Sequence, residues 1–409
     1  MKLIRLLFLG ILFISCGRSK NHTKKQSSHP DPVPVIVGSR VLLQNHLDEL
    51  RGKHVGLVMN ATARVDGTPM VDTLIARGIN VTALFGPEHG FRSGSGAGKK
   101  IKNGIDQKTG LPVYSLYGKH RKPTPEELKN VDILLFDMQD VAAHFYTFNT
   151  TLGLVIKAAA NAGIPVWVLD RPIPAGGNYV AGWTLQKKYR SFVGAYPIPM
   201  AYGMTMGELA KMIVGEHWLK TKKKPKIRVI KMKGWKRSMK WPDTGLKWQP
   251  PSPNLPHFQN AYVYLGTVLF EATNISEGRG TPEPFLTIGA PKTNLSEKDV
   301  KNLRQQFPAI SIDTTTFTPH SIPGKSLHPE YEGKVCHGVK LHVNNINKFD
   351  PLTFGVALLR VMLRATPGAH TTNYIYKLTG SAAIDSLQPS WQQDVKKFRS
   401  ERKKYLIYN

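Results

Sequence analysis

Cysteine is nearly absent from this chain of 409 residues, which contains only Cys16 and Cys336. A framework of several disulfides is therefore excluded, and so is a zinc site built from cysteine pairs. Because Cys336 has no metal-ligand neighbours in the sequence, we expect it to be a small buried hydrophobic side chain.

Acidic residues are also scarce, since 28 Asp and Glu stand against 56 Lys and Arg, giving a net charge of +28. Such an excess bears on partners rather than on the fold, and it favours an anionic partner such as nucleic acid, anionic lipid or an acidic wall polymer. We interpret the basic runs at residues 220–224 and 399–404 as solvated faces.

The apolar stretch at the N-terminus is too short to span a membrane. Residues 6–15 follow a basic start, and a spanning helix needs about 20 residues, so we interpret residues 1–16 as an export signal. The sequence FISC at residues 13–16 resembles a bacterial lipobox, which makes Cys16 a candidate lipidation site; plain secretion is the alternative. We expect residues 17–38 to form a flexible tether.

The predicted export signal decides between the anionic partners. It places the protein in the bacterial cell envelope, lipid-anchored and with the periplasm as the expected compartment, and it argues against a nucleic-acid partner. Contact with the membrane is then expected only through the N-terminal lipid.

Strand-like and helix-like segments alternate through the first part of the chain. This rhythm predicts an α/β fold, a Rossmann-like parallel sheet with helices on both faces. The expected strands are residues 55–59, 81–85, 112–116, 131–136, 165–169 and 227–232, and the expected helices are residues 70–75, 152–162 (with Gly163 as a stop) and 205–218.

A proline-rich segment breaks this pattern. Residues 249–256 contain four prolines, which continue neither a helix nor a central strand. We therefore predict a Rossmann-like N-terminal domain at residues 39–254 and a smaller α+β domain at residues 255–409. In the second domain we expect helices near residues 351–364 and from residue 391.

Polar side chains follow four of the expected strands. In an open parallel sheet, ligands bind beyond the carboxyl ends of the strands, so these groups converge on one edge. Each alone has a structural alternative: Asp137 and Asp170 suit helix N-caps, and Asp170 with Arg171 suits an ion pair. Together they predict a site, whose candidates from this part of the chain are Asn60, Glu88, His89, Asp137, Gln139, Asp140 and Arg171.

Nucleotide, metal and serine-hydrolase motifs are missing. The glycine-rich segment at residues 94–100 has Ser93 where the P-loop needs glycine and Lys100 where it needs serine or threonine. There is no HExxH or CxxC, and His89 has no second histidine at ligand spacing. A Gly-x-Ser-x-Gly elbow is absent too. We predict no cofactor and no metal.

A second dense motif occupies residues 270–281, where two carboxylates, an amide and a guanidinium lie close together. Arg279 between two glycines suits bidentate capture of a carboxylate, although an ion pair with Glu277 is the alternative. Glu271 and Asn274 complete the motif.

Eight motifs occur in an order that resembles the NamZ-type exo-β-N-acetylmuramidases, over nearly the whole chain from about residue 41. They are GPEHG (86–90), TGLPVYSLYG (109–118), DMQDV (137–141), FYT (145–147), VLDRP (168–172), GMT with GELA (203–210), PPSPNLP (250–256) and SEGRGT with PF and GAP beyond it (276–291).

The resemblance implies a glycoside hydrolase that removes N-acetylmuramic acid from the non-reducing end of peptidoglycan fragments, with Glu88 as general acid and base in the cleft between the domains. The second catalytic group stays open between Asp140, Glu271, Glu277 and the N-acetyl group of the substrate. Arg279 or Arg171 is a candidate clamp for the lactyl carboxylate. Pocket residues implied by the motifs are Asn60, Asp137, Gln139, Asp140, Tyr146, Arg171, Asn274, Glu277 and Arg279, and His89 and Glu271 join them as substrate-binding candidates.

Three departures from the family pattern bear on activity: Ala142, His144 and Ile173 stand where we expect Gly, Arg and Asn. They leave open a non-catalytic or altered-specificity lipoprotein that binds the cell wall through the same cleft. An amidase or deacetylase acting on the same polymer is a third, weaker alternative, because no metal set or nucleophile elbow is visible.

Overall fold

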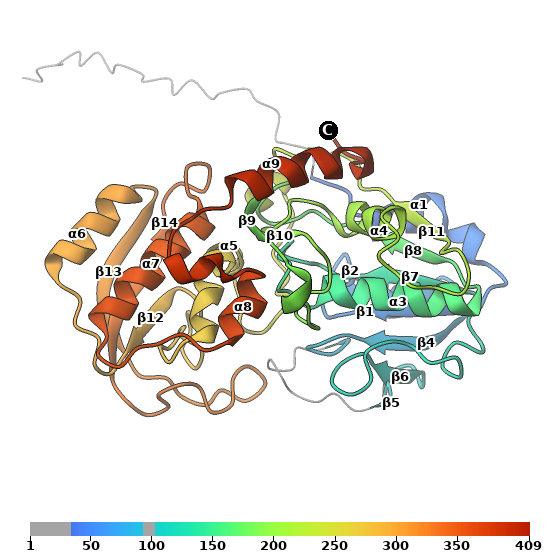
Figure 1. The fold of residues 1–409 in the computed structure, drawn as a ribbon. Helices are drawn as coiled ribbons and strands as arrows, with labels where there is room; N and C mark the ends of the chain where they lie inside the picture. The colour runs from blue at the N-terminus through green and yellow to red at the C-terminus, as the bar shows by residue number, and fades with distance from the viewer. Residues whose placement is uncertain (1–33, 93–102) are drawn as a thin grey trace, which may run out of the picture. The chain divides into compact units, whose positions relative to one another are not determined.

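The computed structural model describes residues 34–92 and 103–409 (Figure 1). The predicted export signal, Cys16, all but the last residues of the tether and the glycine-rich segment 94–100 lie outside these residues. Within them, no helix is both long and apolar enough to cross a membrane.

A seven-stranded sheet carries the first part of the chain, in the order β11-β8-β7-β1-β4-β6-β5. Every pair is parallel except β5 with β6, so the predicted parallel α/β sheet is confirmed, with one antiparallel strand added at its edge. Its strands are β1 (Val55–Met59), β4 (Val81–Gly86), β5 (Gly104–Ile105), β6 (Pro112–Ser115), β7 (Ile133–Asp137), β8 (Val166–Leu169) and β11 (Ile227–Ile230).

Helices cover both faces of this sheet, as predicted. Successive strand residues point to opposite faces: Leu57 and Leu135 share a core with the helices α1 (Gly38–Asn45) and α2 (Met70–Ala76), whereas Val58 and Phe136 share one with α3 (Phe148–Ala162) and α4 (Met206–Gly215). The end of α3 and the start of α4 have clear local causes. Gly163 takes a left-handed φ of 84° after α3, as expected for a stop, and Thr205 and Glu208 form a capping box at α4.

The first described residues already belong to the packed structure. The predicted tether reaches residue 38, but Val35 is buried and its N–H donates to the Thr244 carbonyl at 2.9 Å. Gly38 begins α1 so close to the sheet that a Cβ there would lie 2.4 Å from the Asp170 nitrogen. The packed chain therefore starts before residue 39.

The C-terminal part is smaller and mixed, as predicted. The strands β12 (Thr287–Ala290), β13 (Ile310–Phe317) and β14 (Cys336–Val343) form an antiparallel sheet in the order β12-β14-β13. Cys336 is buried, as expected. The helices of this part are α5 (Phe258–Thr267), α6 (Glu297–Gln306), α7 (Pro351–Ala365), α8 (Tyr374–Thr379) and α9 (Gln392–Glu401).

Shorter elements complete the described chain, and the limits of the two predicted domains stay a prediction. The remaining strands are β2 (Arg64–Val65), β3 (Thr68–Pro69), β9 (Ala181–Thr184) and β10 (Pro199–Ala201). Short 3₁₀ helices occur at Leu47–Leu50, Lys187–Tyr189, Trp241–Thr244, Val268–Ala272, Ala382–Ser386 and Arg402–Tyr405.

Helices α5 and α7 touch through their backbones. A Cβ on Gly266 would lie 1.9 Å from the Pro351 carbonyl oxygen, and one on Gly355 would lie 2.5 Å from Gly266. Only glycine permits this distance, and it brings α5, which carries Tyr264, tightly against the C-terminal core.

The last residues of the chain return to the first part (Figure 1). Arg402 is 4% exposed, and its guanidinium donates to the carbonyls of Gly177, Tyr202 and Gly203 at 2.5–3.1 Å. The prediction that residues 399–404 form a solvated face is therefore wrong at Arg402, because backbone carbonyls of a distant segment accept the hydrogen bonds of its buried guanidinium.

Candidate active site

The GPEHG motif forms a tight turn at the end of β4. Gly86 ends the strand, and the Gly90 N–H donates to the Pro87 carbonyl at 3.0 Å. His89 and Gly90 both have left-handed backbones, with φ of 75° and 83°. This conformation is costly for a residue with a Cβ such as His89, and such strain is typical of functional turns. The turn presents Glu88 beyond the carboxyl end of the sheet.

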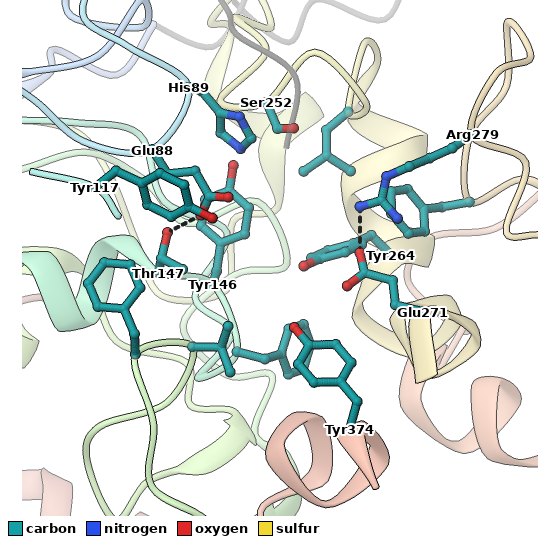
Figure 2. A pocket seen from close by; sticks show the side chains of 15 residues that line it. Glu88, His89, Tyr117, Tyr146, Thr147, Ser252, Tyr264, Glu271, Arg279 and Tyr374 are labelled. Atoms are coloured by element: carbon teal, nitrogen blue, oxygen red, sulfur yellow. Dashed lines mark hydrogen bonds and ion pairs between the residues drawn. The ribbon is translucent and has the colours of Figure 1, made fainter. Parts of the chain in front are cut away.

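Glu88 faces a cavity of about 270 Å³ that is lined by residues of both the N-terminal and the C-terminal part of the chain. Figure 2 shows Glu88, Tyr117 and Thr147 on one side and Glu271, Arg279 and Tyr264 on the other. The complete lining is Glu88, His89, Tyr117, Phe145, Tyr146, Thr147, Phe192, Val193, Ser252, Leu255, Tyr264, Glu271, Arg279, Phe285 and Tyr374. Aromatic walls with a few convergent polar groups are characteristic of a small-molecule site.

Two hydroxyl groups hold the Glu88 carboxylate. The Thr147 hydroxyl donates to Glu88 Oε2 at 2.9 Å, and Tyr117 forms a second hydrogen bond to the same side chain. Burial and the neighbouring carboxylate raise the pKa of Tyr117 to about 12, so its phenol stays protonated and acts as a donor. Glu88 is thereby fixed in orientation.

The opposite wall is built on a shared guanidinium. Arg279 donates to Glu271 at 2.6 Å and to Glu277 at 2.5 Å. Burial raises the pKa of Glu271; Arg279 opposes that shift, and the nearby charges of Glu277 and Glu88 add to it. The predicted pair of Arg279 with Glu277 is present, and Glu271 makes it a triad. Glu271 and Arg279 face the cavity, whereas Glu277 lines an adjoining hollow.

Five predicted site residues are buried outside the cavity lining. Arg171 pairs with Asp137 through two hydrogen bonds, at 2.6 and 3.2 Å. Gln139 donates to the Pro172 carbonyl at 2.6 Å, and Asn60 accepts from the Thr62 backbone at 3.1 Å. Asp140, which is 2% exposed, accepts from the Tyr202 hydroxyl at 2.6 Å, and burial raises its pKa to about 6. These groups hold the strand ends in place.

Asp137 and Asp170, for which a helix cap or an ion pair was the structural alternative, have different partners. Asp170 accepts from the Gly207 N–H at 2.9 Å and from the Thr205 hydroxyl at 2.7 Å, at the start of α4, so it serves the helix N-terminus. The ion pair of Arg171 is made with Asp137 and not with Asp170.

Asn274 joins two loops outside the cavity lining. Its amide donates to the Gly368 carbonyl at 3.0 Å and accepts from the His370 N–H at 2.9 Å. Of the predicted site residues, the cavity thus brings together Glu88, His89, Tyr146, Glu271 and Arg279.

The three departures from the family pattern are all buried and lie outside the cavity lining. Ala142 has a left-handed φ of 57°, a conformation that glycine adopts without strain. The His144 ring contacts the Ile198 carbonyl at 3.1 Å and the Leu378 carbonyl at 2.8 Å, joining the loop before β10 to α8.

Several cavity residues were not among the predicted site residues. Tyr117, Thr147, Ser252, Leu255 and Phe285 lie inside the quoted motifs, so the motifs contained the signal. Tyr264 and Tyr374 stand alone on helices, and nothing in their local sequence marks them. Over the described residues, no group of three or more His, Cys, Asp or Glu side chains is arranged to hold a metal ion.

Comparison with known proteins identifies the family. Residues 55–259 match the exo-β-N-acetylmuramidase NamZ N-terminal family, and residues 262–408 match its C-terminal counterpart. This chain belongs to the NamZ family. The resemblance inferred from the eight motifs is therefore confirmed, and with it membership of a glycoside hydrolase family.

Individual NamZ relatives agree with this. A Bacillus subtilis (strain 168) protein named peptidoglycan β-N-acetylmuramidase NamZ is 40% identical over 405 residues, covering 95% of this chain and 94% of that protein. Two Bacteroides fragilis crystal structures of DUF1343 family proteins match as well. One is 34% identical with a TM-score of 0.80, covering 92% of this chain and 100% of its own; the other is 32% identical with a TM-score of 0.74, covering 92% and 99%.

Proposed function

We propose that this protein is an exo-acting β-N-acetylmuramidase that releases N-acetylmuramic acid from the non-reducing end of peptidoglycan fragments. The observation that carries the proposal is the pair of carboxylates, Glu88 and Glu271, on opposite walls of one aromatic cavity. The identity with the Bacillus subtilis peptidoglycan β-N-acetylmuramidase supports it.

We assign Glu88 as the general acid and base. Protonated Glu88 donates its proton to the glycosidic oxygen as the bond to the anomeric carbon breaks, and the resulting carboxylate then takes a proton from the attacking water. Thr147 and Tyr117 keep the carboxyl group oriented through both steps, because each donates a hydrogen bond to it.

Glu271 is our choice for the second carboxylate. Asp140 is buried outside the cavity lining, and Glu277 faces the adjoining hollow, so neither reaches the space in front of Glu88. Glu271 lies in the lining, where its negative charge stabilises the oxocarbenium-like transition state, with or without help from the N-acetyl group of the sugar.

We assign the lactyl carboxylate of the sugar to Arg279 rather than to Arg171. The Nε–H of Arg279 is buried and finds no hydrogen-bond partner among the described residues, and the side chain faces the cavity. Arg171 is committed to its buried pair with Asp137. A guanidinium N–H without a protein partner can donate to a carboxylate oxygen of the substrate.

A chromogenic β-N-acetylmuramide tests the proposal directly. We expect release by the wild type and a fall in kcat of at least about 100-fold for Glu88→Gln, the usual contribution of a general acid. Glu297→Gln, an exposed glutamate of α6, is the matched control and should leave kcat unchanged. No release by the wild type, or undiminished release by Glu88→Gln, refutes the assignment.

The same assay separates hydrolysis from wall binding alone. The departures Ala142, His144 and Ile173 lie outside the cavity lining, which supports catalysis over a purely binding lipoprotein. Retention on isolated cell walls with no turnover of any muramyl glycoside is the result that the binding alternative predicts.

We further propose that the protein is exported and anchored in the cell envelope through a lipid on Cys16. The support is the FISC sequence at residues 13–16, behind a short apolar stretch. Metabolic labelling with an alkyne fatty acid should mark the wild type, and Cys16→Ser should abolish the label and move the protein out of the membrane fraction. Labelling that survives Cys16→Ser contradicts the proposal.

A further inference from the structure

A second hollow of about 680 Å³ lies beside the catalytic cavity and is rimmed by positive charge. We call it the basic groove. Its cationic rim contains Lys119, Arg121, Lys122, Lys157 and Lys222, together with His120, and its apolar surface comes from Pro123, Pro125, Leu128, Leu154, Ala158, Ala162 and Phe192. Among the described residues that line it, none is an aspartate or a glutamate.

One face of α3 forms a wall of the groove. Thr150, Leu154, Lys157, Ala158 and Asn161 all line it, and their spacing of three and four residues places them along one side of the helix. The loop at residues 119–125 lines it too, and Lys222 comes from the basic run at residues 220–224 that we interpreted as a solvated face.

Within the described residues, an acid faces the charged rim of this groove only at His120, whose Nε2 lies 3.4 Å from Glu127 Oε2. In the described part of the chain, the ion pairs made by lysine side chains involve other lysines, and none includes Lys119, Lys122, Lys157 or Lys222. Like charges gathered around one hollow repel each other, so the arrangement favours an anionic ligand.

The groove begins on the same side of the cavity as Glu88. Tyr117 bonds to Glu88, and its ring centroid lies 5.9 Å from that of Phe192. Phe192 lines both hollows, and the Arg121 guanidinium lies 4.7 Å from its ring centroid. Aromatic side chains thus connect the catalytic acid to the basic rim.

We propose that the basic groove binds the carboxylate-bearing remainder of the glycan strand, the part that leaves when the terminal sugar is cut off. This inference rests on the proposed function. A general acid stands next to the oxygen of the leaving group, so the leaving strand emerges on the side of Glu88. The lysines and Arg121 bind its carboxylates, and the apolar surface packs on its sugar rings and peptides.

The double variant Lys122→Glu/Lys157→Glu tests the groove, with Lys298→Glu/Lys301→Glu in α6 as the control of equal charge change. We measure kcat and KM on the chromogenic muramide and on a muramyl oligosaccharide of defined length. We expect KM for the oligosaccharide to rise about tenfold in the groove variant only, with both constants for the chromogenic muramide unchanged. The difference should shrink at high salt.

Two kinetic results overturn the inference: an unchanged KM for the oligosaccharide, or an equal rise for both substrates. An oligosaccharide with methyl-esterified carboxylates is the ligand control, and groove variant and wild type should treat it alike; a tenfold difference there also refutes the proposal.

Binding measurements keep this inference separate from the proposed function. If the wild type cleaves neither substrate, the hydrolase assignment fails, and fluorescence anisotropy with labelled oligosaccharide still reports whether the groove variant binds it more weakly. If poly(glycerol phosphate) binds the wild type more tightly than the oligosaccharide and loses that affinity in the groove variant, the groove serves a phosphate polymer and our assignment of the ligand is wrong.

Discussion

At the scale of single residues, the hydroxyl of Thr147 has the most direct link to the chemistry. It donates to Glu88 Oε2 at 2.9 Å from the residue that precedes α3. A hydrogen bond to a charged group contributes about 1.5–3 kcal/mol, and the isosteric valine removes only the hydroxyl. We expect Thr147→Val to lower kcat on the chromogenic muramide by about tenfold or more.

The control for this variant is Thr73→Val on α2, whose hydroxyl bonds to the Pro69 carbonyl. Steady-state kinetics should show kcat falling for Thr147→Val with KM nearly constant, and neither constant changing for the control. Equal rates for Thr147→Val and the wild type would mean that Thr147 does not orient Glu88.

His144 gives the stability of the protein a defined dependence on pH. Burial lowers its pKa from 6.5 to about 4 in the folded state. Between these values the unfolded chain binds a proton that the folded chain does not, so acidification from pH 6.5 to 4 removes about 3 kcal/mol of unfolding free energy. We expect His144→Gln to lose less stability over this range than the wild type.

Urea unfolding at several pH values between 4 and 7.5 measures this difference. Asp140, whose pKa is raised to about 6, acts in the opposite direction, but it is present in both proteins and cancels in the comparison. If the free energy of unfolding changes with pH equally in the wild type and in His144→Gln, the His144 imidazole is not held neutral in the folded state.

At the scale of elements, the contact between α5 and α7 should tolerate no side chain. Gly266→Ala places a methyl group against the Pro351 carbonyl, and both sides of the contact are backbone, which cannot rotate away. Overpacking of this kind costs about 1–3 kcal/mol or more, so we expect a lower Tm. Gly104→Ala is the control, because among the described residues, its chain neighbours aside, no atom lies within 4 Å of its Cβ position. A Gly266→Ala protein as stable as the control contradicts the close contact.

Much of the fold could be predicted from element patterns. The parallel strands β1, β4, β7 and β8 are largely apolar runs because both of their faces are buried, and Thr205 and Gly163 mark helix ends by ordinary capping chemistry. Strands of the C-terminal sheet were harder to see. In β13 the residues Asp313, Thr314 and Thr315 leave little apolar alternation, since half of the strand faces solvent.

The candidate site was only partly predictable, for a physical reason. Strand order shows which side chains reach one edge of a sheet, but not which of them the neighbouring loops then bury. Glu88 stays in the cavity because a left-handed turn lifts it out, whereas Asp137 and Asp140 remain at the strand end and find partners there. Tyr264 and Tyr374 also line the cavity, but they lie on helices whose position next to the end of β4 could not be predicted from the sequence.

At the scale of the whole molecule, the C-terminal residues complete the first part of the chain. The Tyr408 hydroxyl donates to the buried Asp170 at 2.7 Å and accepts from the Met232 N–H at 3.0 Å. Removing it leaves a buried polar group with fewer partners, at a cost of about 1–3 kcal/mol. We expect Tyr408→Phe to lower the Tm while kcat at low temperature stays unchanged.

Tyr189→Phe is the matched control, because phenylalanine keeps both ring contacts of Tyr189, the stacking on Tyr376 at 5.4 Å between ring centroids and the Lys188 Nζ at 4.8 Å. Differential scanning fluorimetry should show a clear shift for Tyr408→Phe alone. Equal melting temperatures for both variants would show that the C-terminal residues add little to the stability of the first part.

The same return of the chain sets an order of events during synthesis. Glu208 accepts from the Ile407 N–H at 3.0 Å, and the Arg237 N–H donates to the Asn409 carbonyl at 2.7 Å. The sheet emerges from the ribosome early, yet these bonds have no partner until residues 402–409 have been made. The hydrogen bonding of the first part is therefore complete only after residues 402–409 have followed the sheet out of the ribosome.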